Sequence, residues 1–175
     1  MKNSKILLLL ILISGSFLCC KKERLTKATQ NGANTFSCKI DGKVFVAKVV
    51  YSVPTMPGLS ASYSLNTKKF EIYAIEPRDK SENGLTRDVN IEIYDPKQGT
   101  NLLNSKDLGQ VVISEYNQLD RYYLTSNTIN GSVTITKFDT STHVISGSFS
   151  FRATQTTNSN SIIKITDGRF DITYK

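Results

Sequence analysis

Residues 131–153, GSVTITKFDTSTHVISGSFSFRA, decide the fold class of this 175-residue chain. Apolar and polar residues alternate in the two halves of the stretch, on either side of a loop around 139–142. The apolar positions are Val133, Ile135, Ile145, Phe149, Phe151 and Ala153. Such a period of two indicates strands that are buried on one face. Gly147 within the second run predicts a bulge or the close approach of a neighbouring strand.

The same alternation continues outward toward both ends of the chain. Residues 70–74 and 89–93 alternate in this way, and Phe36, Cys38 and Ile40 do so up to Asp41-Gly42. An Asp-Gly pair suits a two-residue type I′ hairpin turn, which sets Cys38 opposite Phe45 and brings the apolar residues onto one face. The sequence therefore predicts a hairpin at the start of the domain.

A second hairpin is predicted at the C-terminal end, where Asp167-Gly168 follows another alternating run. A turn at this dipeptide pairs Ile165 with Phe170 on one face. On the other face it sets Lys164 opposite Asp171, a favourable cross-strand charge pair.

Residues 112–123 offer the one helical alternative, because their apolar residues also recur at spacings of three and four. All other segments predict strands, about nine or ten in number. We therefore expect one all-β domain over 35–175, an antiparallel β-sandwich, with a closed, lipocalin-like β-barrel as the alternative.

The N-terminus has the composition of a secretion signal. Lys2 and Lys5 precede an apolar run over 6–13 and the small residues Ser14-Gly15-Ser16. This run is too short to span a bilayer. We expect a lipoprotein signal peptide over 1–19, lipidation of Cys20 and a flexible tether within 20–34. Cys19 is the alternative lipidation site, although it would follow Leu18, a poor residue at the cleavage position.

The net charge of +7 lies mostly at the front of the chain. Residues 1–34 carry six of the 22 basic residues and one of the 15 acidic residues. The domain that follows is nearly balanced, with both signs interspersed. A basic groove for nucleic acid is therefore not predicted.

Several motifs together resemble an uncharacterised family of all-β lipoproteins that is common in Bacteroidota. They are an early Ile-Asp-Gly hairpin, a Phe-Asp loop, a Ser-Gly-x-Phe-x-Phe strand and a final Gly-x-Phe strand. Here they fall on 40–42, 138–139, 146–151 and 168–170. The resemblance implies the architecture and an envelope location. It carries no activity to transfer.

Catalytic and metal-binding signatures are not evident in the sequence. His143 is the single histidine, which excludes a site with several histidine ligands, and we expect it to be an exposed loop residue. No Gly-x-Ser-x-Gly elbow and no Cys-x-x-Cys pair occurs. Cys38 is expected to be a buried small hydrophobe. We therefore predict no enzymatic activity, no cofactor and no metal.

Exposed tyrosines are the best candidates for binding residues, because a tyrosine ring can stack on a sugar or anchor a protein contact. Tyr116, Tyr122 and Tyr123 lie in the least regular segment. We expect a monomeric, lipid-anchored binding or interaction module with a protein or glycan partner. A carrier of a small apolar ligand and a hydrolase are the alternatives. Lys21 after Cys20 favours the outer membrane, and the sequence leaves the periplasmic or surface-facing orientation open.

Overall fold

The computed structural model describes residues 24–47, 57–79, 85–115 and 118–175. These residues form eleven strands and no helix, and every strand pairing is antiparallel. The all-β antiparallel fold is therefore confirmed. The strands are β1 (Thr35–Ile40), β2 (Lys43–Val46), β3 (Leu59–Ser64), β4 (Lys69–Asp79), β5 (Leu85–Tyr94), β6 (Gly99–Leu103), β7 (Leu108–Ser114), β8 (Arg121–Leu124), β9 (Gly131–Asp139), β10 (Val144–Gln155) and β11 (Asn158–Thr173).

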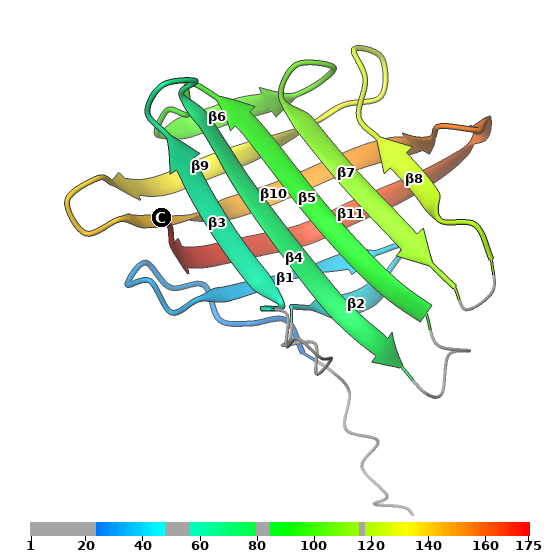
Figure 1. The fold of residues 1–175 in the computed structure, drawn as a ribbon, viewed down its shortest axis with the longest axis horizontal. Helices are drawn as coiled ribbons and strands as arrows, with labels where there is room; N and C mark the ends of the chain where they lie inside the picture. Colours follow the sequence, from blue (N-terminus) through cyan, green and yellow to red (C-terminus); the bar gives the residue numbers. More distant parts are fainter. Residues whose placement is uncertain (1–23, 48–56, 80–84, 116–117) are drawn as a thin grey trace, which may run out of the picture.

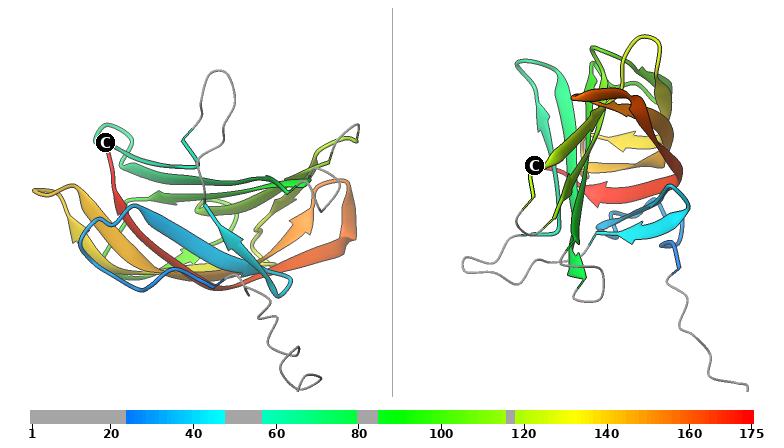
Figure 2. Two further views of the ribbon diagram at one scale, coloured as in Figure 1. Left: turned by 90° about the horizontal axis from the view of Figure 1, so that it is seen from below. Right: turned by 90° about the vertical axis from the view of Figure 1, so that its right-hand side faces the viewer.

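The strands belong to one sheet that curls into a half-barrel, so that two layers face each other (Figure 1). The front layer has the order β8-β7-β5-β4-β3, and the back layer has the order β6-β9-β10-β11-β1-β2. The two layers join where the end of β10 pairs with β8 (Figure 2). The arrangement is a sandwich joined along one side. It is not the closed barrel, because no strand pairing links β2 to β3 among the described residues.

The predicted hairpin at Asp41-Gly42 is confirmed. Ile40 pairs with Lys43, and Cys38 pairs with Phe45. Asp41 and Gly42 both have positive φ, at 47° and 82°, as a type I′ turn requires. The alternation of apolar residues and the Asp-Gly turn predict the same register here.

The predicted hairpin at Asp167-Gly168 is wrong, because β11 runs through this dipeptide without turning. Asp167 has a φ of 53° and lies in a β-bulge, where the register shifts against both β1 and β10. The extended β11 pairs with β10 on one side and with β1 on the other, whereas a turn would break the pairing with both strands. Lys164 consequently lies opposite Arg152 rather than Asp171.

The helical alternative for 112–123 is also wrong. The described part of this segment belongs to β7 and β8, whose pairing sets Val111 opposite Tyr123. Both side chains are buried, at 0% and 4% exposure. Burial against the opposite layer decides the conformation. It stabilises a strand whose alternate side chains are apolar, whereas a helix here would have no apolar surface to pack against.

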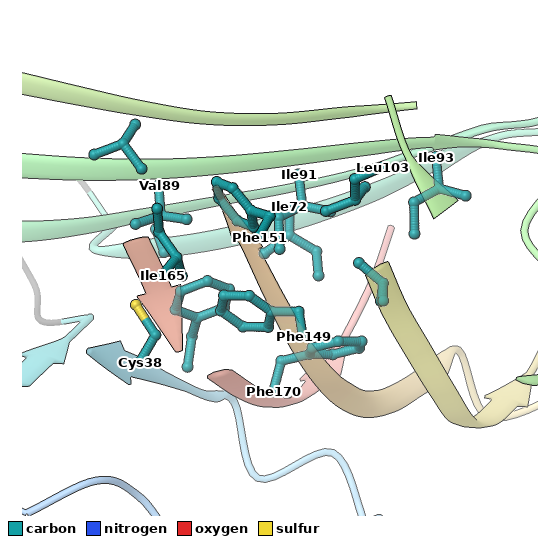
Figure 3. Close-up of a cluster of buried hydrophobic side chains, with 14 of the residues drawn as sticks. Cys38, Ile72, Val89, Ile91, Ile93, Leu103, Phe149, Phe151, Ile165 and Phe170 are labelled. Atoms are coloured by element: carbon teal, nitrogen blue, oxygen red, sulfur yellow. The ribbon is translucent and has the colours of Figure 1, made fainter. Parts of the chain in front are cut away.

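The core lies between the two layers and consists of interdigitated aliphatic and phenylalanine side chains (Figure 3). Three of the phenylalanines lie directly opposite a glycine on the neighbouring strand. The pairs are Phe149 with Gly168, Phe170 with Gly147 and Phe151 with Gly131. A Cβ on each of these glycines would come within 2.2–2.8 Å of the opposing phenylalanine side chain. Gly147 and Gly168 therefore leave the space that the rings occupy, and Gly131 allows close approach to the backbone at Phe151.

The structure confirms both predictions for Gly147, a bulge and the close approach of a neighbouring strand. The register of β10 against β9 shifts between Ser146 and Gly147. A Cβ at Gly147 would also lie 2.3 Å from the carbonyl oxygen of Thr134. The position therefore combines a bulge with close backbone packing.

The edge strands β2 and β3 are both covered by hydrogen bonds from elsewhere in the molecule. Arg87 donates to the carbonyl oxygen of Val44 at 3.3 Å, and the amide of Val46 donates to Glu76 at 3.4 Å. Arg87 and Glu76 also form an ion pair whose side chains are only 12% and 11% exposed. On β3, the Tyr63 amide donates to the carbonyl oxygen of Lys175, and the Lys175 amide donates to that of Ala61. Covered edges offer no template for pairing with another chain.

Residues 24–34, called here the N-terminal strap, lie across the outside of the back layer (Figure 2). The buried carboxylate of Asp171 holds the strap. It accepts hydrogen bonds from the Thr29 hydroxyl at 2.6 Å and from the backbone amides of residues 31, 32 and 33. Ser146 donates a further bond at 2.7 Å. The sequence predicted a flexible tether over 20–34, whereas the structure places its described part, 24–34, on the sheet.

Burial alone would raise the pKa of Asp171, but the hydrogen bonds from Thr29, Ala33, Ser146 and Gly32 outweigh burial and lower the pKa to about 2. The carboxylate is therefore ionised at neutral pH. Its charge strengthens each of these bonds.

Candidate binding surface

The tyrosines that the sequence predicts as binding residues differ in their exposure to solvent. Tyr122 points outward from β8 and is 43% exposed. Tyr123 points inward and is 4% exposed, so its ring belongs to the core and cannot meet a partner. Tyr116 and the two candidate lipidation residues, Cys19 and Cys20, lie outside the described residues. Only Tyr122 remains as a described candidate from the sequence.

Tyr122 shares the outer face of the front layer with two rows of side chains. In one row Tyr122 lies opposite Val112, which lies opposite Asp88. In the next row Gln110 lies opposite Asn90, which lies opposite Tyr73. The surface called here the Tyr122 face consists of Tyr73, Asp88, Asn90, Gln110, Val112 and Tyr122.

Asp88 and Tyr73 form a hydrogen-bonded pair on this face. The Tyr73 hydroxyl donates to Oδ2 of Asp88 at 3.0 Å. Burial, together with the charge of Asp88 and this bond, raises the pKa of Tyr73 to about 12. Burial also raises the pKa of Asp88, the bond from Tyr73 opposes the increase, and the charge of Asp120 adds to it. Asp88 is thus a carboxylate whose charge is poorly compensated by its surroundings.

Two acceptor oxygens on the face have no hydrogen-bond partner in the described structure. They are Oδ1 of Asp88 and Oδ1 of Asn90, and both are shielded from water. The Asn90 amide nitrogen donates to Glu92 at 3.3 Å. Shielded acceptors without partners destabilise the protein, and a ligand on the surface does not reach them without a shift of the side chain. The half-buried polar side chains of Asp88, Asn90 and Gln110 suit a ligand with hydroxyl groups.

The outer surface of the front layer beside the Tyr122 face is also acidic, although the chain as a whole is basic. Glu71 and Glu92 lie directly opposite each other next to the Asn90 row. Lys69 forms ion pairs with both, at 3.2 and 3.6 Å, and is the cation of this group. Together with Asp88, the outward-facing carboxylates outnumber the lysine.

His143 and Cys38, the other residues with catalytic or metal-binding side chains, do not lie on the Tyr122 face. His143 is exposed in the turn before β10 and contacts Tyr174 edge-on, with a ring separation of 5.5 Å. Cys38 is fully buried, which confirms the predicted burial, and desolvation raises the pKa of its thiol far above the usual value. Among the described residues, no three His, Cys, Asp or Glu side chains gather as metal ligands would.

The sequence did not identify Tyr73, Asp88 and Asn90 as site residues. Their signal was present, because each stands at an outward position of an alternating strand. The alternation shows which residues face outward, but only the register shows which of them are neighbours.

Comparisons with protein-family models, with curated protein sequences and with solved structures find no match. The family resemblance stays a prediction. Among the described residues, none belongs to a helix that is long and apolar enough to cross a bilayer.

Proposed function

We propose that this protein is a lipid-anchored, non-enzymatic binding module of the cell envelope, and that the Tyr122 face binds a glycan. The N-terminal signal and Cys20, with Cys19 as the alternative, support anchoring at the outer membrane. Two or more acyl chains on such a cysteine give stable anchoring. Mass spectrometry of the mature N-terminus tests this part of the proposal. An unmodified N-terminus after residue 20 would refute it.

The observation that carries the glycan proposal is the exposed Tyr122 ring in one row with Asp88. A tyrosine ring offers an apolar surface on which a sugar ring stacks. Sugar hydroxyls would exchange hydrogen bonds with the half-buried polar side chains of Asp88, Asn90 and Gln110. Tyr122 and Asp88 are two strands apart, about 10 Å, with the small side chain of Val112 between them. This spacing leaves room for a ring between the stacking group and the acceptors.

The carrier alternative finds no support in the core. Between the described strands, the space is occupied by the side chains of the hydrophobic cluster (Figure 3). The hollows on the back layer are lined mainly by residues of β9, β10 and β11 and by strap residues 28–30. A surface ligand therefore fits the molecule better than an enclosed apolar one.

A glycan array tests the proposal with the full chain and two variants. Tyr122→Ala removes the stacking surface, and Asp88→Asn removes the acceptor charge. We expect each to lower the signal of any bound glycan at least tenfold. Tyr94→Ala is the matched control, because Tyr94 is 36% exposed on the same layer but about 20 Å along the strand from Asp88. Unchanged signals for both site variants would remove the Tyr122 face from consideration.

A further inference from the structure

The outer face of the back layer carries the opposite charge to the Tyr122 face. Cations project outward from its strands, and others lie on the N-terminal strap. They include Lys39, Lys137, Arg152, Lys164, Arg169, Arg24 and Lys27. Two carboxylates of this face are neutralised or covered, since Asp167 pairs with Lys39 at 2.8 Å and Asp171 is buried beneath the strap. The two outer faces of the sandwich therefore attract different partners.

Arg152 and Lys164 form an exposed part of this basic face. They lie directly opposite each other across β10 and β11, and both side chains are exposed. In the described structure neither side chain has an ion-pair or hydrogen-bond partner, although Asp41 accepts a bond from the backbone amide of Lys164. Like charges directly opposite one another destabilise a sheet. An anion between them would relieve this repulsion.

Beside these two cations the surface is hollowed and lined with hydroxyl groups. One hollow of about 330 Å³ contains Ser150 and Thr166 together with Arg152 and Lys164. Two further hollows, of about 390 and 380 Å³, continue along β10 and β11 as far as strap residues 28–30. Phosphate oxygens accept hydrogen bonds from hydroxyl groups and from arginine and lysine. The lining therefore matches a phosphate-bearing surface.

The strap fixes this face close to the anchor. Arg169 donates to the carbonyl oxygen of Thr26 at 3.0 Å, and Lys137 donates to that of Gln30 at 3.2 Å. Arg24 follows Cys20 by four residues, which span at most about 14 Å when fully extended. A chain lipidated at Cys20 would thus hold Arg24, at the start of the strap, within that distance of the lipidated residue.

We propose that the outer face of the back layer docks on the anionic head groups of the membrane that anchors the chain, with Arg152 and Lys164 contacting lipid phosphates. This inference rests on the lipid anchor of the proposed function. It sets the orientation of the domain, because the Tyr122 face lies on the opposite layer (Figure 1). The Tyr122 face then points away from the bilayer, toward its ligand.

Fluorescence quenching on vesicles tests the orientation with the full, lipidated chain. A probe is attached through Ser148→Cys on the back layer or Ser62→Cys on the front layer, and the quencher is a head-group spin label. On vesicles that contain phosphatidylglycerol, we expect several-fold stronger quenching at residue 148 than at residue 62. Vesicles of phosphatidylcholine alone should abolish the difference, because neutral head groups do not attract the cations.

The charge-reversal variant Arg152→Glu/Lys164→Glu should also abolish the difference. Lys97→Glu/Lys106→Glu is the matched control, because both lysines are exposed in loops next to β6, away from the hollows. The control should keep the difference. Equal quenching in the unmodified protein, or an unchanged difference in the Arg152/Lys164 variant, would overturn the docking proposal.

Vesicle flotation at high salt separates this failure from failure of the anchor. Protein that floats with the vesicles but shows equal quenching is anchored without docking, which overturns the inference alone. Protein that does not float has no lipid anchor, which overturns both the inference and the anchoring part of the proposed function.

Discussion

Gly168 lies directly opposite Phe149 across β10 and β11, and the Phe149 ring occupies the space that a side chain at Gly168 would need. A Cβ at Gly168 would come within 2.5 Å of a ring carbon. The ring is buried and stacks on Phe36, with 4.9 Å between ring centroids. The contact therefore links β11 to the first strand of the domain.

We expect Gly168→Ala to lower the free energy of unfolding by about 2 kcal/mol, because the added methyl group forces Phe149 out of place. Urea denaturation measures the change. Adding Phe149→Leu should recover part of the loss, since the smaller side chain makes room for the methyl group. Strictly additive effects of the two substitutions would show that the residues do not compete for this space.

Asp171→Asn should weaken the attachment of the N-terminal strap and destabilise the fold by about 2 kcal/mol, because an amide replaces a charged acceptor of five hydrogen bonds. Hydrogen exchange at the amides of Gly32 and Ala33 should become faster. Asp167→Asn, which removes an exposed carboxylate from the same strand, should leave both measurements nearly unchanged. Equal protection in the two variants would contradict the role of Asp171.

The pH dependence of stability follows from the same carboxylate. The folded-state pKa of Asp171, about 2, lies below the value of about 4 in an unfolded chain. The ionised group therefore stabilises the fold above pH 4, and this contribution, about 2 kcal/mol, is lost as the pH falls toward 2. Urea denaturation over this range should show a steeper loss of stability in the unmodified protein than in Asp171→Asn.

Arg87→Met should lower stability by about 3 kcal/mol, because it leaves the charge of Glu76 in a site from which most water is excluded. It also removes the bond to Val44, which uncovers part of the β2 edge. The double variant Glu76→Gln/Arg87→Met should be less destabilised than Arg87→Met, since no buried charge remains. Thermal unfolding compares the two, and the reverse order would refute the argument.

Tyr122→Ala and Tyr123→Ala should differ sharply although the residues are adjacent. Tyr123 is 4% exposed in the core, so its truncation should cost about 3 kcal/mol or more. Tyr122→Ala should change stability by less than about 0.5 kcal/mol, as is usual for surface substitutions. Denaturation of both variants tests the inward and outward orientations. Similar losses would show that β8 is in the other register.

The two Asp-Gly dipeptides show how far the sequence predicts this fold. At Asp41-Gly42 the turn and its register follow from local pattern alone. Asp167-Gly168 has the same local signal, and Asp167 has the same positive φ, yet the chain forms a bulge. The difference arises from β1 and β10, which pair with β11 on both sides. Such long-range pairing is not encoded near the dipeptide, so alternation predicts the strands but not their order.

The candidate site was predictable only in part for a similar reason. Strict alternation about Tyr123 and Val111 places Tyr122 on the outside, but the helical spacing over 112–123 competed with it in the sequence. Asp88 and Asn90 become neighbours of Tyr122 only through the pairing of β5, β7 and β8. Asp171 stands at an outward position and is nonetheless buried, because the N-terminal strap covers it. No local pattern predicts that cover.

The pairing of β1 with β11 delays folding until the chain is complete. Thr35 and Asp171 are partners from the first and the last strand of the domain. β1 can therefore pair with its second neighbour, β11, only after the last strand is present. β10 also joins the two layers, so the front layer completes its contacts equally late. Contacts of such long sequence separation form slowly. The first strand of the domain therefore completes its pairing only after the last strand has been made, although local hairpins such as β3–β4 do not depend on it.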